Sequence, residues 1–218
     1  MFKKLVAEAI GTAFLLIGVV GSGIMADALS PDNTGVALLA NAIATGCILY
    51  VIITLLGPIS GAHFNPAVSL AFMLRGELSF AHALPYIIVQ ISAGIVGVWI
   101  AHLMFDLTVL QTSTTLRTGA SQWVSEIVAT FGLLFVILGG LRHAPTAIPT
   151  LVAIYITGAY WFTSSTSFAN PAVTIARSLT DTFAGILPGN MPMFIVMQLI
   201  GAAIAVAVAQ GLFSPDLD

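Results

Sequence analysis

Long apolar runs alternate with short polar connections along the whole chain. Six of these runs are long enough to cross the hydrocarbon layer of a membrane, which takes about 20 helical residues. Two shorter apolar runs each begin with proline, which suits the first turn of a helix. We predict six membrane-spanning helices near 4–26, 34–56, 83–105, 122–140, 147–164 and 191–213, and two half-helices near 66–74 and 171–179.

The two halves of the chain carry the same residues at matched positions. Glu8 and Glu126 form a weaker match, 118 residues apart. Because each half holds three predicted spans, an odd number, the second half enters the membrane from the opposite side. We expect one all-α membrane domain, residues 1–218, built from inverted repeats at about 1–110 and 118–218. The stronger match, at a constant separation of 105 residues, pairs Ser60, Asn65, Pro66, Ala67, Val68 and Ala71 with Ser165, Asn170, Pro171, Ala172, Val173 and Ala176.

The composition agrees with an integral membrane protein. Hydrophobic residues make up 58% of the chain and charged residues 7%, whereas about a quarter of a soluble domain is charged. The net charge of −3 and the absence of a basic run exclude a nucleic-acid partner. The single cysteine, Cys47, excludes an intramolecular disulfide and is expected to be a packed thiol. The scattered histidines indicate no metal site, and nothing in the sequence calls for a cofactor.

Basic residues near the ends of the spans predict the orientation in the membrane. A cytoplasmic N-terminus would place Lys3, Lys4, Arg75 and Arg142 inside and leave Arg117 and Arg177 outside. No small-residue cleavage site follows a short apolar core, so the first span is expected to be retained. With an even number of spans, both termini are predicted to be cytoplasmic.

The paired half-helices indicate a pore. Lipid cannot satisfy free backbone groups, so a broken helix at membrane depth survives only when it is buried or lines a water-filled cavity. A helix N-terminus carries a partial positive charge of about half an elementary unit, and two such ends would repel cations. Asn65 and Asn170 precede the helix-starting prolines, where each side chain can cap the helix and donate into the pore. One such tripeptide is an ordinary capped helix start, whereas two at matched positions predict a channel for neutral solutes.

The motifs Asn65-Pro66-Ala67 and Asn170-Pro171-Ala172, with the segments 60–64 (SGAHF) and 7–12 (AEAIGT), resemble the aquaporin and aquaglyceroporin superfamily. The resemblance covers nearly the whole chain. It implies a right-handed bundle of six spans, a homotetramer embedded in membrane lipid, one pore for small neutral solutes in each subunit, and no enzymatic activity.

The resemblance also implies roles for three supporting residues. Glu8 and Glu126 would accept hydrogen bonds from the loops before the half-helices and hold the loop carbonyls toward the pore. A side chain reaching lipid headgroups, for Glu8, and a proton relay are the alternatives. His63 matches a position whose carbonyl lines the pore, and a pH-responsive gate is the other possibility for its ring.

Four positions set selectivity in the family, and its spacing assigns them here to Thr45, Gly158, Ser167 and Val173. The last is normally arginine. None of the four is charged or aromatic, which implies a wide filter and fits neither the strict water channels nor the usual glycerol channels. Arg177, one helical turn beyond Val173, could give the outer vestibule a positive charge, or could instead reach the interface or pair with Asp181.

The run 170–181 resembles a bacterial aquaglyceroporin branch associated with arsenic-resistance operons. That resemblance implies a channel of the bacterial inner membrane for arsenous acid and related arsenicals, glycerol and water. An ion-coupled transporter and a closed structural membrane protein are the competing functions. The neutral paired motifs disfavour the transporter, because transporters put ionisable groups at the midplane, and the small filter residues disfavour the closed pore.

Overall fold

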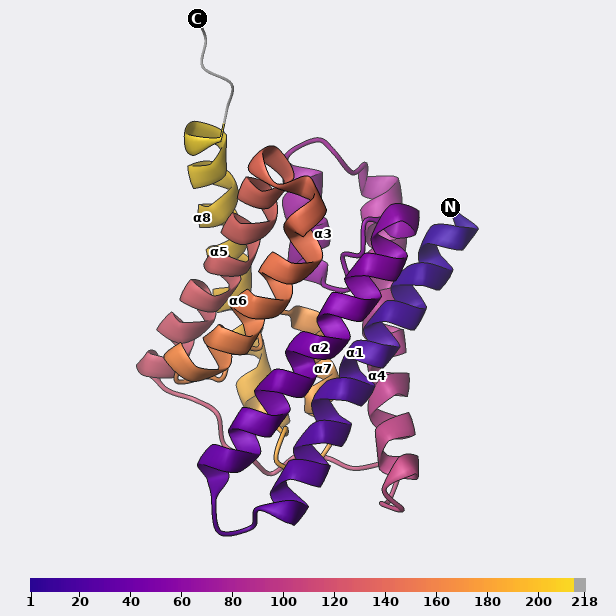
Figure 1. The fold of residues 1–218 in the computed structure, drawn as a ribbon, viewed down its shortest axis with the longest axis vertical. Helices are drawn as coiled ribbons and strands as arrows, with labels where there is room; N and C mark the ends of the chain where they lie inside the picture. The colour runs from indigo at the N-terminus through magenta and orange to yellow at the C-terminus, as the bar shows by residue number, and fades with distance from the viewer. Residues whose placement is uncertain (214–218) are drawn as a thin grey trace, which may run out of the picture.

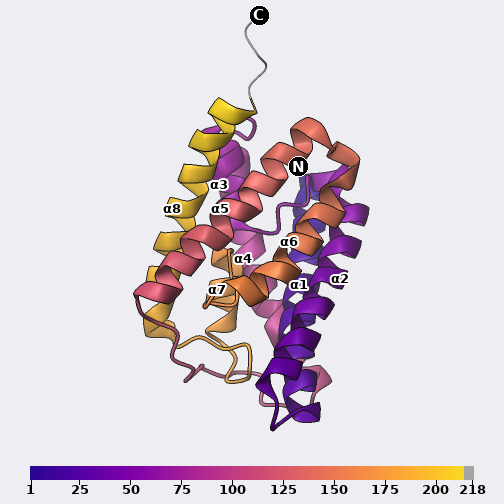
Figure 2. The same cartoon turned by 60° about the vertical axis from the view of Figure 1, so that its left-hand side comes forward.

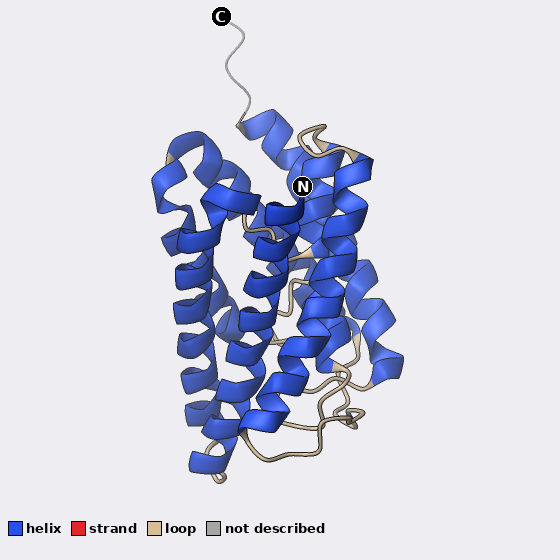
Figure 3. Cartoon of the chain, turned by 90° about the vertical axis from the view of Figure 1, so that its right-hand side faces the viewer, coloured by secondary structure: helices blue, strands red, loops and turns tan. Residues whose placement is uncertain are grey.

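The computed structural model describes residues 1–213, and every regular element in that range is a helix (Figures 1 and 3). The predicted all-α class is confirmed. Five helices are long and apolar enough to cross a membrane. They are α1 (Phe2–Leu29), α2 (Thr34–Ser60), α4 (Phe80–Met104), α5 (Ala120–His143) and α8 (Met191–Leu212), the last preceded by the 3₁₀ turn η2 (Pro188–Asn190).

The helix expected at 147–164 is present but shorter than predicted. It is α6 (Ile148–Phe162), 15 residues long and preceded by the 3₁₀ turn η1 (Pro145–Ala147). At 1.5 Å per residue its axis spans about 22 Å, less than the hydrocarbon thickness of about 30 Å. The run of hydroxyl residues from Thr163 to Thr166 ends it early, because serine and threonine side chains compete with helical backbone bonds.

The two predicted half-helices are α3 (Pro66–Leu74) and α7 (Pro171–Arg177), the second two residues shorter than expected. Each begins at proline directly after an asparagine cap. Figures 1 and 2 place α3 in one half of the bundle's height and α7 in the other, surrounded by the long helices. The start of α1 and the end of α8 lie at the same end of the bundle (Figure 1).

Glycines bring the long helices close together within each half. A Cβ at Gly97 of α4 would meet the Ala13 carbonyl of α1, and one at Gly201 of α8 would meet the Ile127 carbonyl of α5. Only glycine allows backbones to approach this closely, as membrane bundles commonly require. These two crossings, α1 with α4 and α5 with α8, hold the frame around the half-helices.

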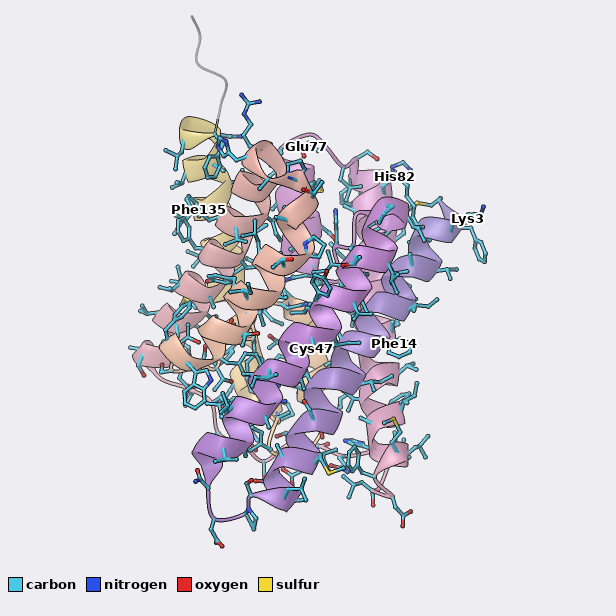
Figure 4. The ribbon with its side chains drawn as sticks, in the orientation of Figure 1. Lys3, Phe14, Cys47, Glu77, His82 and Phe135 are labelled. Atoms are coloured by element: carbon cyan, nitrogen blue, oxygen red, sulfur yellow. The ribbon has the colours of Figure 1, made fainter. Side chains whose placement is uncertain are left out.

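The outer surface of the bundle is apolar along its middle. In Figure 4, Phe14 lies beside the middle of the bundle, while Lys3, Glu77 and His82 lie toward the end where the chain begins. Cys47 is exposed in the chain, so its prediction as a packed thiol is wrong. It shares the outward face of α2 with Ile43 and Tyr50, at helical spacing, so the thiol lies on the outer surface of the bundle.

Candidate pore and its supporting network

Both half-helices are capped by the asparagine that precedes them. The Asn65 Oδ1 accepts from the Ala67 N–H at 2.8 Å, and the Asn170 Oδ1 accepts from the Ala172 N–H at 2.9 Å. An asparagine acceptor satisfies one of the amide groups that a helix start leaves unpaired. With the oxygen committed to the cap, the amide nitrogen of each side chain points away from its own helix.

Each amide nitrogen reaches the loop of the other half. The Asn65 Nδ2 donates to the Ala169 carbonyl at 2.7 Å, and the Asn170 Nδ2 donates to the Phe64 carbonyl at 2.8 Å. These reciprocal bonds bring the two helix starts together. An amide carries two N–H groups, so within residues 1–213 one N–H of each asparagine has no protein partner and can donate to a permeating oxygen.

Glu8 is fully buried beneath the first loop and accepts four hydrogen bonds. The Ser60 hydroxyl and the His63 N–H donate to its Oε1, at 2.7 and 3.0 Å. The Phe64 N–H and the Gln90 side chain donate to its Oε2, at 2.7 and 2.8 Å. Two backbone donors make the carboxylate an anchor for the loop that leads into α3.

Glu126 makes the same set of bonds beneath the second loop, and it is also fully buried. The Ser165 hydroxyl and the Phe168 N–H donate to its Oε1, at 2.6 and 3.0 Å. The Ala169 N–H and the Gln198 side chain donate to its Oε2, at 3.0 and 2.6 Å. The position-by-position match with Glu8 shows that the two glutamates have one common structural task.

The glutamines are supporting residues that the sequence analysis missed. The Gln90 Nε2 also bonds the Ser69 hydroxyl at 3.0 Å, and the Gln198 Nε2 bonds the Thr174 hydroxyl at 2.8 Å. Each glutamine therefore ties a glutamate to its half-helix. An isolated glutamine in an apolar span of each half, like the paired glutamates, is the signal that could have identified them.

The two loops have the same unusual backbone. Residues other than glycine rarely adopt positive φ, which costs about 1–2 kcal/mol for each. The hydrogen bonds to Glu8 and Glu126 hold the loops in this conformation. The positive values, at matched positions 105 residues apart, are Gly61 (89°), Ala62 (50°) and Phe64 (48°), then Thr166 (62°), Ser167 (53°) and Ala169 (48°).

A cavity of about 180 Å³ runs along the two loops, and both asparagines line it. Side chains of α1, α2, α5 and α6, mostly leucine, isoleucine and valine, form its apolar wall. His63 lies along the cavity, its ring bonded to the Ser69 hydroxyl at 3.0 Å and packed against Phe72 and Tyr86. Of the predicted filter residues, Thr45, Ser167 and Val173 line the cavity, as does the vestibule candidate Arg177.

Gly158 does not line this cavity, so its assignment to the filter is contradicted. It is exposed on the outer face of α6. On the same helix, Ile156 and Tyr160 line the cavity, and the Tyr160 hydroxyl lies 3.1 Å from the Thr45 hydroxyl. The family spacing, counted back from Asn170, leads to Gly158, which is two residues away from both cavity-lining positions. Two residues correspond to about half a turn of a helix, so Gly158 faces the opposite side. The cavity wall beside Thr45 therefore contains an aromatic side chain that the sequence analysis missed.

Arg177 is buried, with 3% of its surface exposed, and its guanidinium lies 3.5 Å from the centre of the Phe168 ring. Its Nε donates to the Ala184 carbonyl. It does not pair with Asp181, which accepts instead from the Thr114 N–H and hydroxyl, at 2.8 and 2.9 Å. These two bonds hold the pKa of Asp181 below its ordinary value.

A second arginine from the connection between α4 and α5 reaches the same ring. The Arg117 guanidinium lies 5.2 Å from the Phe168 ring centre, and its Nε donates to the Gly185 carbonyl at 2.7 Å. Its function was not predicted, because nothing in the sequence connects residue 117 with the second half-helix. The end of the cavity formed by Thr45, Tyr160, Ser167 and Arg177 is here called the arginine end. Arg177 lines it directly, whereas Arg117 lies beside the Phe168 ring, which also lines the cavity.

A cavity passing two facing half-helix starts inside a bundle of apolar helices defines a membrane channel of the aquaporin type. The chain belongs to the major intrinsic protein family, whose model matches residues 1–163. It is 56% identical over 213 residues to aquaglyceroporin AqpS of Rhizobium meliloti (strain 1021), covering 98% of this chain and 91% of that protein. It is 28% identical over 235 residues to aquaporin Z of Photorhabdus laumondii, covering 98% and 99%.

A solved structure supports the same fold. The X-ray structure of the aquaglyceroporin from Plasmodium falciparum matches with a TM-score of 0.77 at 17% sequence identity, covering 98% of this chain and 97% of that chain. At that identity the likeness concerns the fold alone. Together the comparisons confirm the predicted family, a family of membrane channels rather than enzymes.

Proposed function

We propose that the protein is a passive channel for water and for uncharged solutes up to the size of glycerol, with arsenous acid and methylated arsenicals among them. The observation that carries this proposal is Val173, a small neutral residue that lines the cavity three residues after Asn170. The nearest guanidinium on α7 stands one turn further along, at Arg177. A pore without a cation at its filter position has more room for a polyol. The name of the relative AqpS, an aquaglyceroporin, supports a solute of this class.

The proposal extends to the assembly. The two halves would be inverted repeats, with four channels in a homotetramer in a bacterial inner membrane and both termini cytoplasmic. The matched networks around Glu8 and Glu126 support the repeat. Lys3 and Arg142 flank the end of the bundle where the chain begins, in agreement with the rule that basic residues favour the cytoplasmic side.

The competing functions have less support. An ion-coupled transporter needs ionisable groups that are free to bind an ion or a proton at the midplane. Glu8 and Glu126 each already accept four hydrogen bonds from the protein. A closed structural protein would not need a cavity that passes both asparagines.

Reconstituted channels should swell in a gradient of glycerol and of arsenous acid, measured by stopped-flow light scattering against protein-free liposomes. Water flux without entry of either solute would contradict the proposed solute class. Swelling abolished by an imposed ion gradient, or dependent on one, would favour a transporter.

Asn170→Asp is expected to lower neutral-solute flux at least tenfold and to admit cations. A carboxylate can still cap α7, but it cannot donate to the Phe64 carbonyl, and it puts a negative charge where two positive helix ends meet. Flux of water and of sodium into proteoliposomes measures both effects. Asn33→Asp is the matched control, because Asn33 caps α2 on the exposed surface, where its Oδ1 accepts from the Val36 N–H. Equal fluxes in the two variants would remove Asn170 from the pore mechanism.

Tyr160→Phe is expected to reduce glycerol flux roughly twofold to tenfold, the value of one hydrogen bond of about 0.5–1.5 kcal/mol. The change deletes the hydroxyl beside Thr45 in a largely apolar passage, so a solute hydroxyl loses a partner. Tyr155→Phe is the control, since the Tyr155 hydroxyl bonds the Ala129 carbonyl away from the cavity lining. The result is read as glycerol permeability per channel, and an unchanged value in Tyr160→Phe would exclude contact with the solute.

A further inference from the structure

Two guanidiniums lie at or near the arginine end of the cavity: Arg177 is buried and Arg117 is half-buried, and neither forms a salt bridge within residues 1–213. Among residues 1–213 the salt bridge found joins Arg75 to Glu77, at the other end of the bundle. The side chains of Arg177 and Arg117 donate to main-chain carbonyls, which carry no net charge. A buried charge outside a salt bridge is costly. The negative charge of the nearby Glu126 carboxylate and the partial negative charge at the end of α7 offset part of that cost.

Donors also face the cavity there without protein partners. Arg177 lines the cavity, and only its Nε has an acceptor within the described chain. Ser167 lines the same cavity, and its hydroxyl is buried there and has no hydrogen-bond partner in the described chain. A guanidinium with unpaired N–H groups and a serine with an unpaired hydroxyl thus line one space at the end of the passage.

The chemistry of these groups selects the ligand. Two parallel N–H groups of a guanidinium match the two oxygens of a planar oxyanion, and charge-assisted bonds of this kind are the strong ones. The serine hydroxyl can donate one more bond. The rest of the wall is mostly apolar, with Ile156 and Val173 nearby, and its other polar groups at this end are the Thr45 and Tyr160 hydroxyls, which lie 3.1 Å from each other. A large or highly charged anion would therefore find too few partners.

We propose that the arginine end is a binding site for a small planar monovalent oxyanion of the formate class, held by Arg177 and Ser167 beside the charge of Arg117. Because the site lies within the passage, an anion bound there obstructs conduction. The binding stands on the geometry alone, whereas the obstruction rests on the proposed channel function.

The first experiment measures binding without conduction. Saturation-transfer NMR on the detergent-solubilised channel should detect formate, and nitrate, also planar and monovalent, should displace it. Arg177→Gln should abolish the transfer and Ser167→Ala should weaken it several-fold. Arg142→Gln, which removes an exposed arginine elsewhere, should behave like the native chain. No transfer to the native channel, or transfer in Arg177→Gln as strong as in the native channel, would overturn the site.

The second experiment measures obstruction. Water permeability of proteoliposomes is compared in formate and in gluconate, which is too large for the site, at neutral pH, equal ionic strength and equal concentration on both sides. Formate should lower native permeability at least fivefold at saturation and leave Arg177→Gln unaffected. Binding with full permeability would refute the obstruction and keep the site. A native channel that binds formate but conducts neither water nor glycerol would refute the channel proposal instead.

Discussion

Replacing Glu126 with alanine is expected to abolish conduction and to destabilise the folded channel severely. The change leaves two backbone N–H groups, one hydroxyl and one glutamine amide without their acceptor in a fully buried place. Each orphaned group costs about 1–3 kcal/mol, and a folded protein has only about 5–15 kcal/mol in total. The second loop would also lose the anchor for its positive-φ backbone.

Thermal unfolding in detergent and water permeability per folded channel measure this effect. Glu8→Ala should behave alike, because Glu8 holds the first loop by the same four bonds. Glu77→Ala is the control, since it removes a glutamate from an exposed ion pair, which is worth about 0–1 kcal/mol. A folded, conducting Glu126→Ala channel would show that the loops keep their conformation without a carboxylate.

The fold could be predicted from the sequence because the patterns that indicate it are either long or present twice. Apolar runs report membrane spans directly, and prolines after asparagines mark the half-helix starts. The ends of the helices were predicted less exactly. The helix α6 ends where hydroxyl residues begin, because their side chains compete for the backbone hydrogen bonds of the helix, and composition alone does not show which bonds form.

The site was only partly predictable, for geometric reasons. Glu8 and Glu126 stood out as charges in apolar spans, whereas Gln90 and Gln198 carry no charge and were passed over. Gly158 was assigned to the filter by counting residues back along the loop before Asn170. An error of two residues in that count is enough to move from the cavity-facing side of α6 to its outer side. The folded chain, and no local pattern, brings Arg117 to the Phe168 ring.

The two halves are most alike at the centre of the passage and differ at its ends. Val68 and Val173 follow the two motifs at matched positions, and both line the cavity. One turn further, at the same separation of 105 residues, Phe72 in the first half corresponds to Arg177 in the second. Each packs against its matched loop ring, Phe72 on His63 and Arg177 on Phe168. The contact joins two aromatic rings in the first half and a guanidinium and a ring in the second. The two ends of the passage therefore differ in charge, although the helices and loops around them match.

Val173→Arg is expected to lower glycerol permeability at least tenfold, about 1.4 kcal/mol, and to lower water permeability less. Val173 is buried, with 5% of its surface exposed, and it lines the cavity. A guanidinium in its place adds bulk, five donors and a fixed charge to the narrow passage, and the charge would join those of Arg177 and Arg117. Water, the smaller solute, is obstructed less by the same side chain.

Two further variants separate size from charge in that result. Val173→Leu adds volume without a cation, and the double variant Val173→Arg/Arg177→Val moves the cation one turn along α7 at constant net charge. Paired stopped-flow measurements of water and glycerol on equal amounts of reconstituted protein give the ratio of the two permeabilities. If Leu raises this ratio as much as Arg does, width alone governs selectivity. If the double variant raises it while Leu does not, the position of the cation governs it. A ratio unchanged in all three would mean that Val173 does not face the narrowest part of the passage, and Tyr160 with Arg177 would become the residues that set it.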